Sequence, residues 1–124
     1  FVLNGLTPLK FAMVAKKCPN TKIVWAHMGG YKVLEFLMLA KRLQNVYFDF
    51  SYSLLYFKNS PTFHNIIYAF KNMKYEKIMY GSDFPDRDIK TSLCNTMQLL
   101  EENVNDNSKI EKLMYKNAKD FYKL

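Results

Sequence analysis

The sequence lacks any apolar stretch long enough to cross a membrane. A transmembrane helix needs roughly 20 consecutive apolar residues, whereas the most apolar segment, residues 33–40, already contains Glu35. The N-terminus also lacks a basic region followed by an apolar one, so no signal peptide is visible. We therefore expect no membrane partner.

Cysteine is scarce as well. Only Cys18 and Cys94 occur, without C-x-x-C spacing, which argues against a disulfide framework or a redox motif. Two free thiols are typical of a reducing compartment, so we expect a cytoplasmic location. The chain begins with Phe1 rather than Met, and we therefore expect a processed chain or a fragment.

Long runs of one charge are absent, although 18 basic residues exceed 11 acidic ones and give a net charge of +7. Such a surplus suggests a nucleic-acid partner. However, the lysines occur one or two at a time, with no run of five and no nucleic-acid-binding motif. We expect solvated helix faces and no nucleic-acid partner. A basic nucleic-acid-binding module is the weaker alternative, and it predicts binding that weakens steeply with salt.

Helical patterns alternate with three short runs of β-forming residues in this chain of 124 residues, which fits one domain. The predicted strands are Lys22–Ala26, Val46–Phe50 and Lys77–Tyr80. The first of them does not alternate, so we expect it to be buried on both faces. Regular alternation of helix and strand predicts an α/β fold with a parallel sheet and right-handed crossovers.

Helix starts are marked by capping residues. Thr7 and Ser60 each precede a proline, and Asp88 precedes a helix predicted to end near Glu102. Ser108-x-x-Glu111 matches a capping box, so we expect a helix to begin there after a loop over residues 103–107.

Polar residues directly follow the three predicted strands. They are His27, Ser51 and Asp83. Ligands of parallel α/β folds bind outside the carboxyl ends of the strands. His27 and Asp83 should lie two strands apart, on the order of 10 Å between strand axes, which side chains and a metal or substrate can bridge. The structural alternatives are a hydrogen-bonded histidine and an aspartate that caps a turn.

Other candidate residues have simpler explanations. His64 lies inside a predicted helix beside Phe63, where packing or surface exposure is expected. Trp25 is expected in the core. Gly29-Gly30 lacks the G-x-G-x-x-G pattern of a phosphate loop.

Together these segments resemble a known family. Pro19-x-x-Lys22-Ile23-Val24-x-Ala26-His27-Met28-Gly29-Gly30 resembles the sixth-strand signature of the amidohydrolase-related ("amidohydrolase 2") branch of the amidohydrolase superfamily. Residues 45–51 resemble its seventh strand, and residues 77–85 its eighth. Asn117-Ala118-Lys119-x-Phe121-Tyr122 is similar to its terminal helix. The order and spacing of four motifs, from about Leu9 to the end, make the resemblance specific.

The resemblance implies that the chain is the C-terminal three βα units of a (β/α)₈ TIM barrel with a divalent metal, usually zinc. Asp83 matches the eighth-strand aspartate, which binds the metal and accepts a proton from the attacking water. His27 matches the sixth-strand histidine, which polarises a substrate oxygen or shuttles protons. We expect a small-molecule substrate, with Ser51 lining its pocket and Arg87 holding an acidic group. Family members include hydrolases of lactones and amides and also nonoxidative decarboxylases, which is the alternative activity.

The sequence departs from the family pattern at two positions. The first-strand H-x-H pair and the fifth-strand histidine are absent, whereas a catalytic zinc site normally has three protein ligands. Three strands also cannot close a barrel. We therefore expect residues 1–124 to be the C-terminal part of a longer enzyme, inactive alone, which pairs with the missing N-terminal half or with a second copy. A noncatalytic fragment that self-associates without metal is the rival interpretation.

Overall fold

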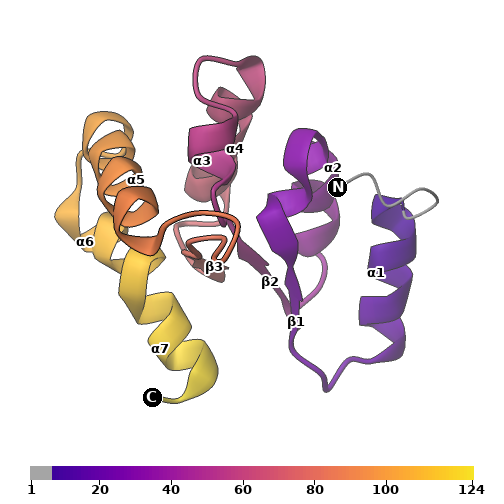
Figure 1. Cartoon of the computed structure of the whole chain (residues 1–124). Coiled ribbons are helices and arrows are strands. Elements are labelled where there is room, and N and C mark those ends of the chain that lie inside the picture. The colour runs from indigo at the N-terminus through magenta and orange to yellow at the C-terminus, as the bar shows by residue number, and fades with distance from the viewer. Residues whose placement is uncertain (1–6) are drawn as a thin grey trace.

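Helices and strands alternate along the chain as the sequence predicts (Figure 1). The structure is a computed structural model that describes residues 7–124. In chain order the elements are α1 (Pro8–Lys17), β1 (Ile23–Trp25), η1 (Ala26–Lys32, a 3₁₀ segment), α2 (Val33–Ala40), β2 (Val46–Asp49), α3 (Ser53–Tyr56), α4 (Pro61–Asn72), β3 (Ile78–Met79), α5 (Ile89–Asn103), α6 (Asn107–Glu111), η2 (Lys112–Lys116, a π-helix) and α7 (Asn117–Tyr122).

The three strands form one parallel sheet in the order β1-β2-β3, which confirms the predicted sheet. Val24 pairs with Tyr47, and Phe48 pairs with Ile78. In Figure 1 the sheet lies between α1 and α2 on one side and α5, α6 and α7 on the other. Because all strands run in one direction, their carboxyl ends meet at one rim of the sheet. The arrangement agrees with part of a barrel, and the closed barrel remains a prediction.

One face of the sheet carries most of the core. An aromatic cluster joins α1, β1, α2 and β2 through edge-to-face contacts of Phe11, Trp25, Phe36 and Phe48, whose ring centroids lie 5.0–6.2 Å apart. Burial alternates along β2: Val46 and Phe48 are buried, whereas Tyr47 and Asp49 are half-buried. Trp25 is in the core, as expected.

Two sequence-based expectations are wrong, one about the burial of the first strand and one about a helix cap. The first strand is not buried on both faces: Ile23 and Val24, which point to opposite faces, are both half-buried, because β1 is an edge strand of the sheet within residues 7–124. Ser108 is not a helix cap. Asp106 takes that place and accepts a hydrogen bond from the Lys109 amide, so the helix begins one residue before Ser108.

The remaining caps agree with the sequence. Thr7, Ser60 and Asp88 each accept a hydrogen bond from a backbone amide three residues later, at the starts of α1, α4 and α5. The segment after Ser51 contains the short helix α3. Within residues 7–124, none of the helices combines the length and the apolar character that a membrane crossing requires.

Candidate functional site

The chain turns through a left-handed conformation after each of the three strands. His27 and Met28 have φ of 53° after β1, Tyr52 has φ of 52° after β2, and Asp83 has φ of 66° after β3. Residues other than glycine seldom adopt positive φ, and such strain concentrates at functional sites. Positive φ also occurs at Lys74, Tyr75 and Lys77 before β3, but at the carboxyl rim it falls on His27 and Asp83, two of the predicted site residues.

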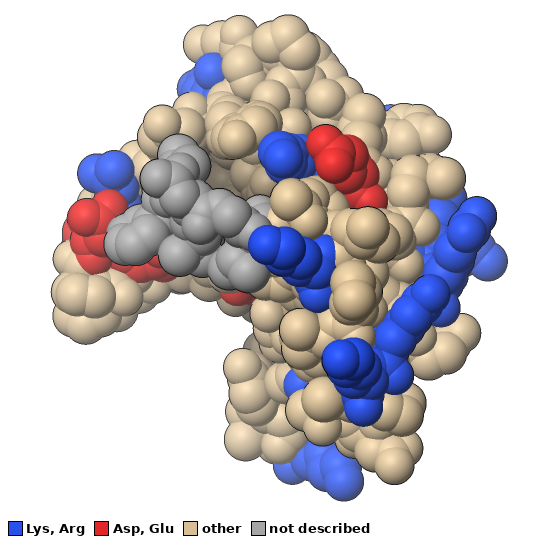
Figure 2. Space-filling view, turned by 90° about the vertical axis from the view of Figure 1, so that its right-hand side faces the viewer, with Lys and Arg blue, Asp and Glu red and all other residues tan. Residues whose placement is uncertain are grey.

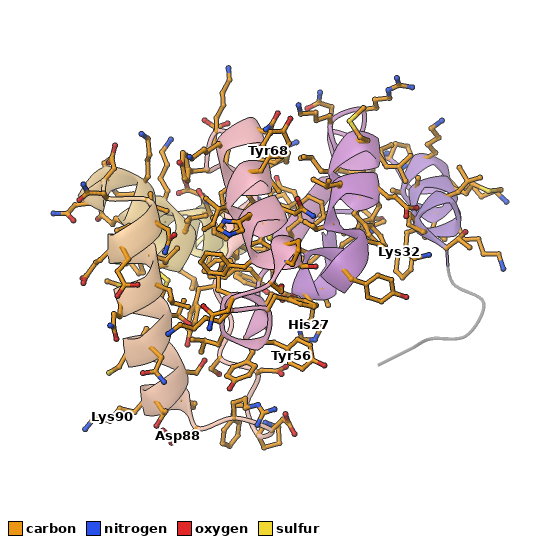
Figure 3. The ribbon with its side chains drawn as sticks, turned by 90° about the horizontal axis from the view of Figure 1, so that it is seen from above. His27, Lys32, Tyr56, Tyr68, Asp88 and Lys90 are labelled. Atoms are coloured by element: carbon orange, nitrogen blue, oxygen red, sulfur yellow. The ribbon has the colours of Figure 1, made fainter. Side chains whose placement is uncertain are left out.

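His27 and Asp83 face each other across this rim. His27 Nε2 lies 3.8 Å from an Asp83 carboxylate oxygen, and the two side chains are 49% and 33% exposed. Figure 3 shows His27 at the same end of the molecule as Tyr56 and Asp88, whereas Tyr68 lies toward the other end. The predicted juxtaposition of His27 and Asp83 is thus present in the structure, and their chemical roles stay predictions.

The backbone of Ser51 fixes the protonation pattern of His27. His27 Nδ1 lies 2.9 Å from the Ser51 carbonyl oxygen. A carbonyl only accepts, so Nδ1 carries the hydrogen and donates it. In the neutral ring the free lone pair is then on Nε2, the atom that faces Asp83. Nε2 is consequently the nitrogen that can exchange a proton with a substrate or bind a cation.

The Ser51 side chain has a different environment from the predicted one. Its hydroxyl packs directly against the Cα of Gly81, where a side chain at position 81 would collide with it. The residue is half-buried between the second and third strand ends. What Ser51 demonstrably provides is its carbonyl group, and pocket lining by its hydroxyl stays a prediction.

Asp49 is a rim residue that the sequence analysis missed. One oxygen of its carboxylate accepts hydrogen bonds from two backbone amides, that of His27 at 3.1 Å and that of Ser51 at 3.0 Å. This links the ends of β1 and β2 and holds the strained His27 backbone. The available signal was a charged residue inside an otherwise apolar strand, two positions after Tyr47 on the same face.

Arg87 lies at the edge of the site. Its guanidinium stacks 4.5 Å from the centre of the Tyr52 ring, and its Nε lies 3.3 Å from Asp86. The Arg87 amide donates to the Asp83 carbonyl oxygen at 3.0 Å. These contacts hold the Arg87 cation on the loop that carries Asp83. Its role in holding an acidic substrate stays a prediction.

A comparison with known protein families identifies the family to which this chain belongs. The family model described as Amidohydrolase matches residues 5–124. The chain belongs to the amidohydrolase family. No curated protein matches it.

Two side chains at the rim of this amidohydrolase chain have the donor chemistry of metal ligands. An imidazole nitrogen and a carboxylate oxygen that converge at the rim are suitable donors for zinc. However, no group of three His, Cys, Asp or Glu residues suited to a metal ion occurs within the part of the chain that the structure describes. His64 is exposed on α4, edge-on to Phe63, and both cysteines are free and exposed. The two donors at the rim, His27 and Asp83, are of a chemical kind that binds metal ions. They are fewer than the three protein ligands of a catalytic zinc site.

The amidohydrolase rim is also open to solvent. One surface hollow of about 270 Å³ lies between α3 and α5 and is lined by residues such as Tyr52, Leu55 and Asn95. Another lies at Tyr47 and Phe121, toward the opposite end of the strands. Neither hollow includes His27 or Asp83, whose side chains are partly exposed.

Proposed function

We propose that this amidohydrolase chain carries the acid–base half of a metal-dependent hydrolase that acts on a small-molecule amide, lactone or carboxylate. The observation that carries the proposal is the 3.8 Å approach of His27 Nε2 to the Asp83 carboxylate at the carboxyl rim of a parallel sheet. Family membership over residues 5–124 supports the hydrolase class. The remaining metal ligands come, in this proposal, from outside residues 7–124.

Each rim residue has one task in the proposed reaction. Asp83 would hold the divalent metal, most suitably zinc, and the metal would acidify the attacking water. The Asp83 carboxylate would accept the proton that the attacking water gives up when the water oxygen bonds to the substrate carbonyl carbon. His27, protonated at Nε2 while Nδ1 stays bonded to Ser51, donates toward the substrate oxygen. Arg87 is suited to pair with an acidic group of the substrate.

Metal binding tests this proposal without knowledge of the substrate. The chain, supplied with the segment that carries the remaining ligands, is titrated with Co²⁺, and the visible absorption of the bound ion is followed. We expect Asp83→Asn to weaken binding about tenfold or more, because a neutral amide replaces a charged ligand. Asp86→Asn is the matched control, since Asp86 lies three residues away and, within residues 7–124, forms an ion pair with Arg87 alone.

Equal Co²⁺ affinity of wild type and Asp83→Asn would remove Asp83 as a metal ligand. Equal losses in the two variants would mean that general negative charge attracts the ion. To test the catalytic step, the chain is combined with the segment that supplies the missing ligands. Its activity is then assayed on lactone, amide and carboxylic acid substrates. Release of carbon dioxide instead of a hydrolysis product would favour the decarboxylase alternative.

A further inference from the structure

The surplus positive charge gathers in three helix-to-strand junctions. These junctions, named here the basic end, are residues 16–22 between α1 and β1, 41–45 between α2 and β2, and 71–77 between α4 and β3. They contain eight basic residues and one acidic residue, Glu76. The other ten basic residues of the chain are matched by ten acidic ones. The basic end therefore carries the entire formal net charge of +7.

The fold brings these junctions together although they are far apart in the sequence. In each βα unit of a parallel sheet the helix runs antiparallel to the strands, so helix C-termini lie opposite the carboxyl rim. α1 packs on α2, and α2 packs on α4, which makes the three junctions neighbours. In Figure 2 a band of Lys and Arg side chains runs along the right and lower right of the view with no Asp or Glu surface among them, whereas other cations lie at the centre and on the left.

The charges of the basic end are not neutralised within the molecule. Within residues 7–124, none of its eight cations has a carboxylate partner within 4.0 Å. Lys41 and Lys77 donate instead to neutral oxygens of Asn72 and Gln44, at 2.9 and 2.7 Å. Glu76 is 3.8 Å from Lys112, outside the basic end. Helix dipoles favour cations at helix C-termini by only about 0.3–1 kcal/mol each, and they leave the net charge unchanged.

We propose that the basic end binds the phosphate backbone of a nucleic-acid duplex, independently of the chemistry at the opposite rim. Packed helices lie about 8–10 Å apart, so three adjacent helix ends span roughly 20 Å. A duplex presents about twelve phosphate charges over that length. The sequence argued against this partner because the lysines are scattered, and scatter along the chain is not scatter in space.

The composition of the basic end favours a nucleic acid over a membrane. Membrane-surface sites combine cations with apolar side chains that enter the lipid. None of the exposed large hydrophobic residues of the described chain falls within the three junctions. The exposed neutral residues there include Asn20, Thr21 and Gln44, and side chains of these types commonly bond phosphate or sugar oxygens.

The test compares two triple variants of equal charge. Lys16→Gln/Lys17→Gln/Lys71→Gln removes three exposed cations of the basic end. Lys32→Gln/Lys58→Gln/Lys90→Gln removes three cations near the carboxyl rim, of which Lys58 and Lys90 are exposed and Lys32 is half-buried. Binding of the full chain to a fluorescent 20-base-pair duplex, as RNA and as DNA, is measured by anisotropy at 50–200 mM KCl. For wild type we expect affinity to fall steeply with salt. The basic-end variant should bind about tenfold or more weakly, with a slope of log affinity against log salt shallower by up to about three.

The control variant should retain the wild-type slope, and circular dichroism should show both variants folded. Equal weakening in the two variants would overturn the proposal, because only bulk charge would then matter. Absence of duplex binding by wild type at 100 mM KCl would overturn it as well. So would binding to phosphatidylserine-containing vesicles in preference to either duplex, since the partner would then be a membrane.

Discussion

At the rim, the Asp49 carboxylate and the Ser51 carbonyl hold the strained His27 residue in place through hydrogen bonds. Asp49 bonds the amides of His27 and Ser51 with one carboxylate oxygen, and Ser51 in turn bonds the His27 ring through its carbonyl. The ring is therefore fixed at its backbone and at one nitrogen. Of the two ring nitrogens of His27, only Nε2 is left free to interact with Asp83.

Replacement of Asp49 by alanine should loosen this arrangement. Two backbone amides would lose a charged acceptor, and we expect the free energy of unfolding to fall by about 2 kcal/mol. Urea unfolding measures the loss, and amide hydrogen exchange at His27 and Ser51 should accelerate. Asp86→Ala, which removes only an exposed ion pair, should change stability by less than about 0.5 kcal/mol. Similar stability of Asp49→Ala and wild type would show that these bonds contribute little.

Gly81 has a steric role beside Ser51. A methyl group at position 81 would overlap the Ser51 hydroxyl, so Gly81→Ala should destabilise the fold by about 1–3 kcal/mol. Thermal unfolding measures the effect. Adding Ser51→Ala to the same chain removes the overlapping oxygen and should restore part of the lost stability. A double variant no more stable than Gly81→Ala would place the conflict elsewhere.

At the scale of elements, helix starts in this chain depend on single acidic or hydroxyl caps. Asp88 begins α5, the helix that follows the loop of Asp83, and accepts from the Thr91 amide at 2.8 Å. Hydrogen bonds from Thr91, through its side chain and its backbone, lower the pKa of Asp88 below its ordinary value of 3.8. The charged form is thus favoured in the folded state.

This shift predicts a pH dependence for the cap. Because the folded-state pKa of Asp88 is depressed, its contribution is complete above pH 3.8 and is lost as the pH falls through the folded-state value. We expect Asp88→Ala to have a lower urea midpoint than wild type at pH 7 and a smaller difference near pH 3. Asp86→Ala serves as control. A difference that stays constant between pH 7 and pH 3 would contradict the prediction.

For the whole molecule, the two edges of the sheet are unequal. On β3 the outward groups have partners, since the Tyr80 amide donates to the Leu113 carbonyl and the Asn117 side chain donates to the Ile78 carbonyl. β1 pairs only with β2 among the residues that the structure describes. Unpaired edge strands tend to pair with another chain, so β1 is the edge at which we expect an N-terminal half or a second copy to add.

Val24→Pro tests this expectation. The Ile23 amide donates inward to Asn45, so the next amide, that of Val24, points outward. Proline at an edge position removes only that outward donor. Sedimentation velocity should show concentration-dependent association of wild type and much weaker association of Val24→Pro. Val46→Pro, in the central strand, should unfold the chain. A wild-type chain that stays monomeric at high concentration would contradict the edge argument.

The sequence by itself determined the elements and the family. Three apolar runs followed by His27, Ser51 and Asp83 predicted a parallel sheet with polar groups at one rim, because strand formation and helix capping depend on residues close in sequence. Only the tertiary structure decided that Asp49 holds His27 and that scattered lysines form one surface. Those outcomes depend on strand register and on which helix ends become neighbours, and local patterns contain neither.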